Sequence, residues 1–227
     1  MMYGKEIGRK FNEDGTARHF MGNTVVADVT PECDAYPVMQ KLRQMVIEEG
    51  FDYNYILLPE DSYHMTVLGG LNDQSRLDFW PQALAPDASM VEADDHVTEA
   101  VKRVGLPGKA KMKFDSVGAG KGCVIIRLVP VNEEQEAILR GFRDRCAEAM
   151  GVFRPKHAEY RFHISLAYTR ILPEGEEELR WKQLVAKMDA FLKEQPPFET
   201  TEPYMAYFND MLYFSPVRVP RTANAKE

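Results

Sequence analysis

Cysteine is scarce in this 227-residue chain, and long apolar runs are absent. The three cysteines, Cys33, Cys123 and Cys146, are odd in number and form no CxxC pair. This pattern argues against a disulfide framework and a structural zinc site, and favours reduced thiols. No segment reaches the roughly 18 to 20 apolar residues that cross a bilayer, and the first residues lack the apolar core of a secretory signal. We therefore expect a cytoplasmic protein that does not bind a membrane.

The chain also has fewer positive than negative side chains. The chain has 28 Lys and Arg against 35 Asp and Glu, a formal net charge of −7, and no dense basic block. A surface of this sign repels the phosphates of a long duplex. A nucleic-acid ligand would therefore have to be small, or be an end held in a local pocket. The apolar share, 44 %, is that of an ordinary globular protein.

Apolar periodicity divides the chain into strands and helices. Strands are predicted at about 23–29, 51–58, 62–68, 111–117, 123–129 and 160–168, with Gly69-Gly70 ending the third. Helices are predicted at 34–50 with Asp34 as cap, at 89–104, from Asn132 past Cys146, and in a long segment that ends before Pro196. A hairpin of 205–208 and 211–214 is expected to close the chain. Asp14-Gly15 marks a smaller hairpin near the start.

The second half of the chain repeats the architecture of the first at an offset of 99 residues. Val25 corresponds to Val124, Pro31 to Pro130, and the order of apolar strand, proline, helix and histidine-bearing strand is the same. The repeat predicts a single bilobal α+β domain whose lobes are related by an approximate two-fold axis. The first lobe covers about 21–70 with a connection at 71–110, the second about 111–215, and residues 1–20 form an N-terminal arm.

Two histidines occupy equivalent strands of the repeat. His64 is followed by Thr66 and His163 by Ser165. Because side chains alternate along a strand, each histidine shares a polar face with its hydroxyl residue, while the opposite face is apolar. Residues at equivalent positions of two such lobes can face one another across a cleft. The alternative, two structural histidines that only satisfy their own hydrogen bonds, is disfavoured by this alternation and by the shared offset.

These motifs resemble a known family. His64-Met65-Thr66-Val67 and His163-Ile164-Ser165-Leu166 are similar to the paired His-x-Thr/Ser signatures of the two-histidine (2H) phosphoesterase superfamily, which includes RNA 2′,3′-cyclic phosphodiesterases formerly called 2′-5′ RNA ligases. The segments 22–26 and 160–168 most resemble a poorly characterised bacterial branch. The resemblance implies two antiparallel-sheet lobes, one histidine from each at a central cleft, and neither metal nor other cofactor.

Two imidazoles suit cleavage of a phosphodiester. Displacement at phosphorus runs roughly in line, so a base is needed on one side and an acid on the other. Histidine serves either role near neutral pH. We expect His64 and His163 to be catalytic and the hydroxyls of Thr66 and Ser165 to bind the phosphate. The further candidates are Arg161 as a phosphate ligand or a surface arginine, and Tyr63, Tyr168 and Tyr53 as base-stacking or packing residues.

The expected substrate is a cyclic phosphodiester of a small nucleotide or an RNA end, most simply a 2′,3′-cyclic phosphate, cleaved by a monomer. A 3′,5′-cyclic (oligo)nucleotide phosphodiesterase or an RNA-end nuclease would use the same site. Two other classes stay open, namely a metallohydrolase with carboxylates such as Asp61, and a non-catalytic nucleotide- or RNA-binding module. His19 could reach the cleft from the arm, whereas His96 and His157 are expected in solvent.

Overall fold

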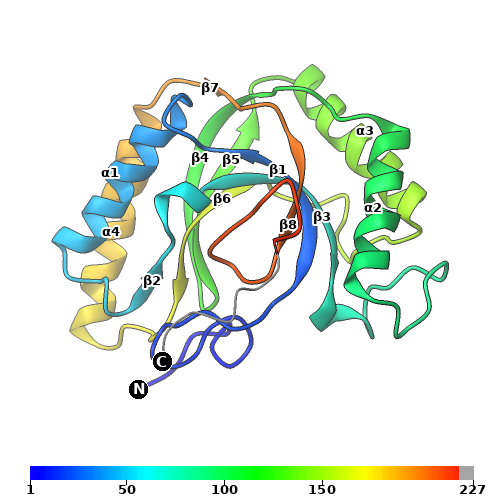
Figure 1. Ribbon diagram of the computed structural model, residues 1–227. Coiled ribbons are helices and arrows are strands. Elements are labelled where there is room, and N and C mark those ends of the chain that lie inside the picture. Colours follow the sequence, from blue (N-terminus) through cyan, green and yellow to red (C-terminus); the bar gives the residue numbers. More distant parts are fainter. Residues whose placement is uncertain (220–227) are drawn as a thin grey trace.

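One antiparallel sheet runs through the molecule, and a pair of helices lies on each side of it (Figure 1). The computed structural model describes residues 1–219. Over that range the strands are β1 (Gly22–Asp28), β2 (Tyr55–Leu57), β3 (His64–Asn72), β4 (Lys111–Ala119), β5 (Cys123–Pro130), β6 (His163–Thr169), β7 (Phe198–Glu199) and β8 (Tyr204–Phe208). The helices are α1 (Ala35–Glu48), α2 (Met90–Val104), α3 (Glu133–Met150) and α4 (Glu176–Lys193). The α+β class is confirmed.

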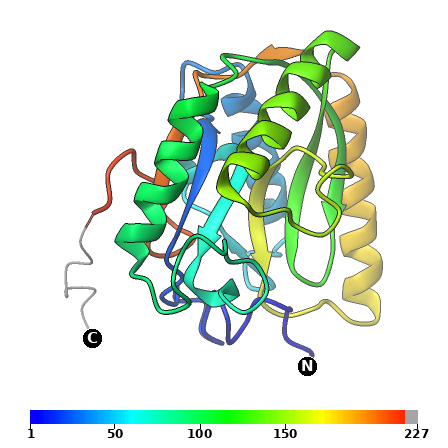
Figure 2. The ribbon, with the colours of Figure 1, turned by 90° about the vertical axis from the view of Figure 1, so that its right-hand side faces the viewer.

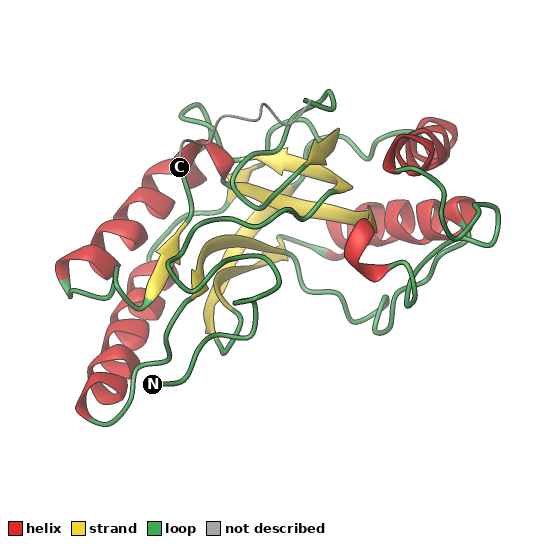
Figure 3. Ribbon diagram, turned by 60° about the horizontal axis from the view of Figure 1, so that its bottom comes forward, coloured by secondary structure: helices red, strands yellow, loops and turns green. Residues whose placement is uncertain are grey.

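The strand order is β7-β4-β5-β6-β3-β1-β8, and β2 pairs with β6. The β1 and β3 half of the sheet thus meets the β5 and β6 half where β3 lies beside β6, with Met65 opposite Ile164. Helices α1 and α4 pack together on one side, and α2 and α3 on the other (Figures 1 and 3). Because α1 and α3 follow equivalent strands, the pseudo-two-fold relation exchanges the two helix pairs.

The repeat extends to the pairing register of the strands. In the β1–β3 pair, Asp28 lies opposite His64 and Val26 opposite Thr66. In the β5–β6 pair, Arg127 lies opposite His163 and Ile125 opposite Ser165, each 99 positions later. Both pairs also have a register shift at the same place, between residues 25 and 26 and between 124 and 125. Since a slip by one residue would turn every side chain to the other face, this register places both histidines equivalently.

The helices begin and end largely at the residues that the sequence indicates. Ser89 and Glu92 form a complete capping box at the start of α2, and the Asn132 side chain accepts from the Gln135 amide at the start of α3. Asp34 precedes α1 but its side chain makes no capping hydrogen bond, so that prediction is wrong. The apolar side chains of α1 are buried along one stripe, through Val38, Met39, Leu42 and Val46.

Several predicted strand boundaries are also wrong, and the strand expected at 160–168 begins only at His163. Strand β3 does not end at Gly69-Gly70 but continues to Asn72. A Cβ on Gly70 would lie 2.0 Å from the Asn23 Oδ1 atom, so glycine serves close approach between β1 and β3 here. The strand expected at 51–58 is only Tyr55–Leu57. Residues 211–214 form no strand, because the backbone pairs Tyr207 with Ser215 and leaves a wide loop between them.

The N-terminal arm packs against the edge of the site. Its turn at Asp14 is closed by hydrogen bonds from Thr16, and Phe11 is fully buried in the core. The amides of Gly4 and Lys5 bond to carbonyls of Arg170 and Lys121, which ties the arm to the second half. The arm lies beneath the sheet in Figure 2. Within residues 1–219, no helix combines the length and the apolar character that a bilayer span requires.

Candidate active site

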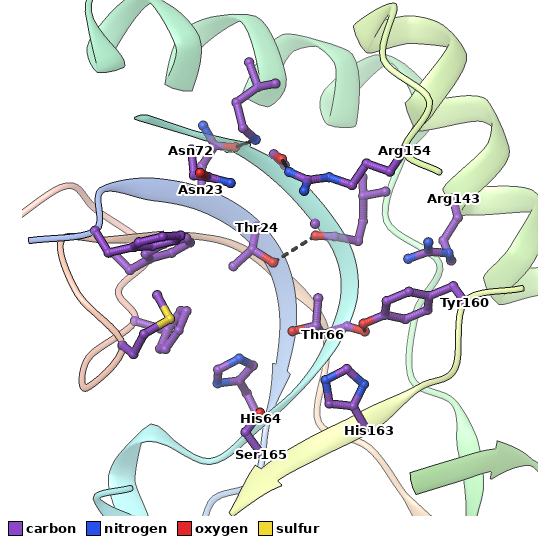
Figure 4. A pocket seen from close by; sticks show the side chains of 18 of the residues that line it. Asn23, Thr24, His64, Thr66, Asn72, Arg143, Arg154, Tyr160, His163 and Ser165 are labelled. Carbon is purple, nitrogen blue, oxygen red and sulfur yellow. Dashed lines mark hydrogen bonds between the residues drawn. The ribbon is translucent and has the colours of Figure 1, made fainter. Parts of the chain in front are cut away.

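The two histidines stand at the first positions of β3 and β6 and point into one pocket (Figure 4). The pocket has a volume of about 340 Å³ and lies along β3 from His64 to Asn72. Thr66 and Ser165, two residues beyond the histidines, also line it. The structure therefore brings the four motif residues together, from the two halves of the chain.

Both imidazoles are held in the same way. The Nδ1 atom of His64 lies 2.8 Å from the carbonyl oxygen of Ser62, and that of His163 lies 2.9 Å from the carbonyl of Arg161. A carbonyl oxygen can only accept, so each Nδ1 carries the proton in this arrangement. The Nε2 atoms are then left to face the pocket. A neutral ring offers a lone pair there, and a protonated ring offers a proton.

Burial favours the neutral form of both rings. It lowers the pKa of His64 from its ordinary value of 6.5 to about 4, with His163 lowering it further and the Ser62 carbonyl opposing the shift. The ring of Phe214 covers His64, with 4.2 Å between the ring centroids. Burial likewise lowers the pKa of His163, assisted by the charges of Arg127 and Lys10. An anion placed between the rings would reverse these shifts, because it stabilises a protonated imidazole.

Four cationic side chains line the pocket, Lys10, Arg143, Arg154 and Lys156. No Asp or Glu of residues 1–219 lines it, although acidic residues outnumber basic ones in the chain. The local charge is thus opposite in sign to that of the whole protein. A positive local charge of this kind favours anionic ligands.

Arg143 and Arg154 come from α3 and the loop after it and were not singled out from the sequence. Arg143 is 5 % exposed, donates to the Val67 carbonyl at 2.8 Å, and lies over the ring of Tyr160 at 3.7 Å. Arg154 donates to the Gly70 carbonyl. The apolar periodicity of α3 could have indicated Arg143, because this residue shares the buried stripe of the helix with Leu139. Arg154 lies in an irregular loop, where periodicity gives no indication.

The other predicted site residues are dispersed. Arg161 is exposed and lies outside the pocket, where only its backbone carbonyl serves the site. Tyr63 is buried in the core, on the opposite strand face from His64, and Tyr53 is exposed beside Arg170. Only Tyr168 of the three tyrosines lines the pocket, and its hydroxyl accepts from the Lys10 ammonium at 3.2 Å.

The remaining histidines differ in part from expectation. His19 is exposed and does not line the pocket. His96 is partly buried and bonds through Nε2 to the Met150 carbonyl, and His157 lines the pocket and contacts Asp144 at 2.8 Å, so neither is simply in solvent. Asp61 is exposed and outside the pocket. Among residues 1–219, His, Cys, Asp and Glu side chains nowhere form a group of three or more that could hold a metal ion.

Comparison with known proteins agrees with this arrangement. Residues 10–122 match the model of the 2H-phosphodiesterase family, described as a domain of unknown function (DUF1868). The structure is similar to the conserved protein of unknown function ATU0111 from Agrobacterium tumefaciens, with a TM-score of 0.84 and 24 % identity over 96 % of this chain and 94 % of that one. It is also similar to LigT of E. coli in complex with 3′-AMP, with a TM-score of 0.52 and 11 % identity over 88 % and 96 % of the chains. No curated protein matches the sequence.

The fold and the paired histidine motifs define a 2H phosphoesterase. The chain belongs to the 2H phosphoesterase superfamily, as its motifs predict. Membership supports a phosphodiesterase-type activity.

Proposed function

We propose that this protein is a metal-independent phosphodiesterase that hydrolyses a cyclic phosphodiester of a small nucleotide or an RNA end, most simply a 2′,3′-cyclic phosphate. The observation that carries the proposal is the equivalent placement of two Nε2 atoms, from β3 and β6, in one pocket that the described residues line with cationic and not with acidic side chains. The pocket volume of about 340 Å³ is near the lower end of small-molecule sites, about 300–1,000 Å³. This size suits a nucleotide or a chain end. The complex of LigT with 3′-AMP gives further support for a nucleotide ligand.

The two imidazoles take different roles in the proposed reaction. His64, covered by Phe214 and with its pKa lowered to about 4, is neutral near pH 7 and accepts a proton from the attacking water at Nε2. The water oxygen bonds to phosphorus as the bond from phosphorus to the sugar oxygen breaks. His163, protonated when the anionic substrate is bound, donates the Nε2 proton to that leaving oxygen. The products are a phosphomonoester and a sugar hydroxyl.

The hydroxyls of Thr66 and Ser165 hold the non-bridging oxygens of the phosphate. Both lie on the same strand faces as the histidines, two residues further along. A hydroxyl donates one hydrogen bond to an oxygen on which charge develops, and such donors stabilise the transition state. Serine in the second motif retains the donor that threonine supplies in the first. Each half thus contributes one imidazole, which acts as base or acid, and one hydroxyl, which binds the phosphate.

Turnover of defined substrates tests the proposal. The panel contains 2′,3′-cyclic mononucleotides, 3′,5′-cyclic mono- and dinucleotides, and short RNAs with a cyclic phosphate end. We expect His64→Ala and His163→Ala each to lower kcat/KM at least about a hundredfold with folding intact. His19→Ala, an exposed histidine outside the pocket, is the matched control and should leave the rate unchanged.

The form of the pH profile tests the division of roles. One neutral and one protonated imidazole in the substrate complex give a bell-shaped dependence of kcat on pH. A single ionisation leading to a plateau would contradict the assignment. Metal dependence is tested separately. Activity that is lost on chelation and restored by a divalent ion would contradict the metal-independent mechanism. Binding of the panel without turnover of any member would instead favour a nucleotide-binding module.

We place this activity in a monomer of the cytoplasm. All three cysteines are free thiols, two of them buried, which suits a reducing compartment. The same panel separates the 2′,3′-cyclic substrate from the 3′,5′-cyclic and RNA-end alternatives.

A further inference from the structure

Two guanidinium groups lie in the pocket beyond the histidine motifs. Arg143 and Arg154 approach β3 from the α3 side, and each is anchored to a backbone carbonyl of that strand, Val67 and Gly70 respectively. Figure 4 shows both pointing toward the same pocket as the histidines, with Arg154 next to Asn72 at the far end. These backbone contacts hold both guanidinium groups in place.

Neither guanidinium has an acidic partner. The arginine ion pairs within residues 1–219 involve Arg9, Arg43, Arg76, Arg140 and Arg218, and not these two. The Nε–H of Arg154 is buried without any hydrogen-bond partner in the described chain, and so is the Oδ1 atom of Asn72, which also lines the pocket. Burial of unpaired polar and charged groups is costly, so a site of this kind is stabilised when a ligand completes it.

Arg154 is too far from the histidines to share their phosphate. A Cβ on Gly69 would lie 3.8 Å from the Arg154 Nε atom, so this guanidinium lies over Gly69. Gly69 is three residues from Thr66 in β3, which at about 3.3 Å per residue is roughly 10 Å. That length exceeds one phosphate group and is comparable with a nucleoside. A phosphate between the histidines therefore leaves Arg154 available for another group of the same ligand.

We propose that Arg154 forms a second phosphate subsite, and that the substrate is a small nucleotide with an additional phosphate at the end opposite the scissile diester. This inference rests on the proposed function, because it takes the first phosphate to lie between His64 and His163. A guanidinium fork matches the charge and the bidentate geometry of a phosphate monoester. The subsite selects phosphorylated substrates over the corresponding nucleosides.

A pair of product analogues tests the subsite without turnover. Titration calorimetry compares adenosine 3′,5′-bisphosphate with adenosine 3′-monophosphate, which lacks only the second phosphate. We expect the bisphosphate to bind at least about tenfold more tightly. Arg154→Gln should abolish this preference by weakening the bisphosphate alone, and Arg154→Lys should restore part of it through its charge. Arg103→Gln, an exposed arginine outside the pocket, is the matched control and should keep the full preference.

Equal affinities of the wild type for the two ligands, or no binding of either, would overturn the subsite. So would an Arg154→Gln variant that keeps its thermal unfolding transition and loses affinity for both ligands equally, because Arg154 would then act on the first phosphate or on pocket shape. Failure of the proposed function is distinguishable, since it is seen as absent turnover of every cyclic phosphodiester while the bisphosphate preference and its dependence on Arg154 persist.

Discussion

His64 makes the stability of the fold sensitive to acid. In the unfolded chain this residue takes up a proton near pH 6.5, whereas burial holds its pKa at about 4 in the folded protein. Between these two values the unfolded state binds more protons, so the free energy of unfolding falls as the pH falls. The two pKa values differ by an amount equivalent to roughly 3 kcal/mol, lost between about pH 6.5 and pH 4. Above pH 6.5 the effect disappears, because the ring is neutral in both states.

Replacing His64 by a residue that does not titrate should remove this loss. We expect urea unfolding of His64→Gln to be less affected by a change from pH 7 to pH 4 than that of the wild type, by up to about 3 kcal/mol. With an m value of about 1–3 kcal/mol/M, the difference between the two proteins in midpoint shift is about 1 M or more. The same carboxylates titrate in both proteins, so their contribution to the free energy of unfolding cancels when the two midpoint shifts are compared. The exposed His19→Gln serves as control, and an acid response of His64→Gln equal to that of the wild type would refute the reasoning.

Two further changes test the surroundings of the site. Phe214→Ala removes the ring 4.2 Å from His64 and admits water, so the pKa of His64 should rise above about 4 in an NMR titration of the imidazole protons; an unchanged midpoint would show that other groups bury the ring. Gly70→Ala places a Cβ against Asn23 Oδ1 and should lower the free energy of unfolding by about 1–3 kcal/mol in urea. Gly120→Ala, where the added Cβ meets open space, is its control, and equal losses in the two variants would contradict the packing argument.

The repeat made the centre of the site predictable. An offset of 99 residues and the alternation of side chains place His64, Thr66, His163 and Ser165 on polar strand faces, and the structure brings them into one pocket. These positions depend on local periodicity and on pairing register, both of which are visible in a sequence. For the same reason the helices at 34–50 and 89–104 and the start of α3 at Asn132 were predicted.

The rim of the pocket depends on contacts between distant segments, and the sequence could not supply it. Lys10 belongs to the arm, Arg154 to an irregular loop, and Phe214 to a loop between Tyr207 and Ser215. Proximity in sequence favoured Arg161 instead, because it precedes His163 by two residues. Its side chain is exposed, since β6 begins only at His163 and the strand alternation does not extend back to it.

Asp28 and Arg127 place residues of opposite charge on the two sides of the catalytic centre. These residues occupy matching places in the duplicated register, one beside each imidazole. Two matched histidines alone would accept a diester equally well in either direction, with its leaving oxygen toward β3 or toward β6. The surroundings of the two rings differ, however, because burial under Phe214 lowers the pKa of His64 to about 4 while Arg127 adds a positive charge beside His163, so the residues that the duplication did not preserve make the two sides of a bound diester unequal.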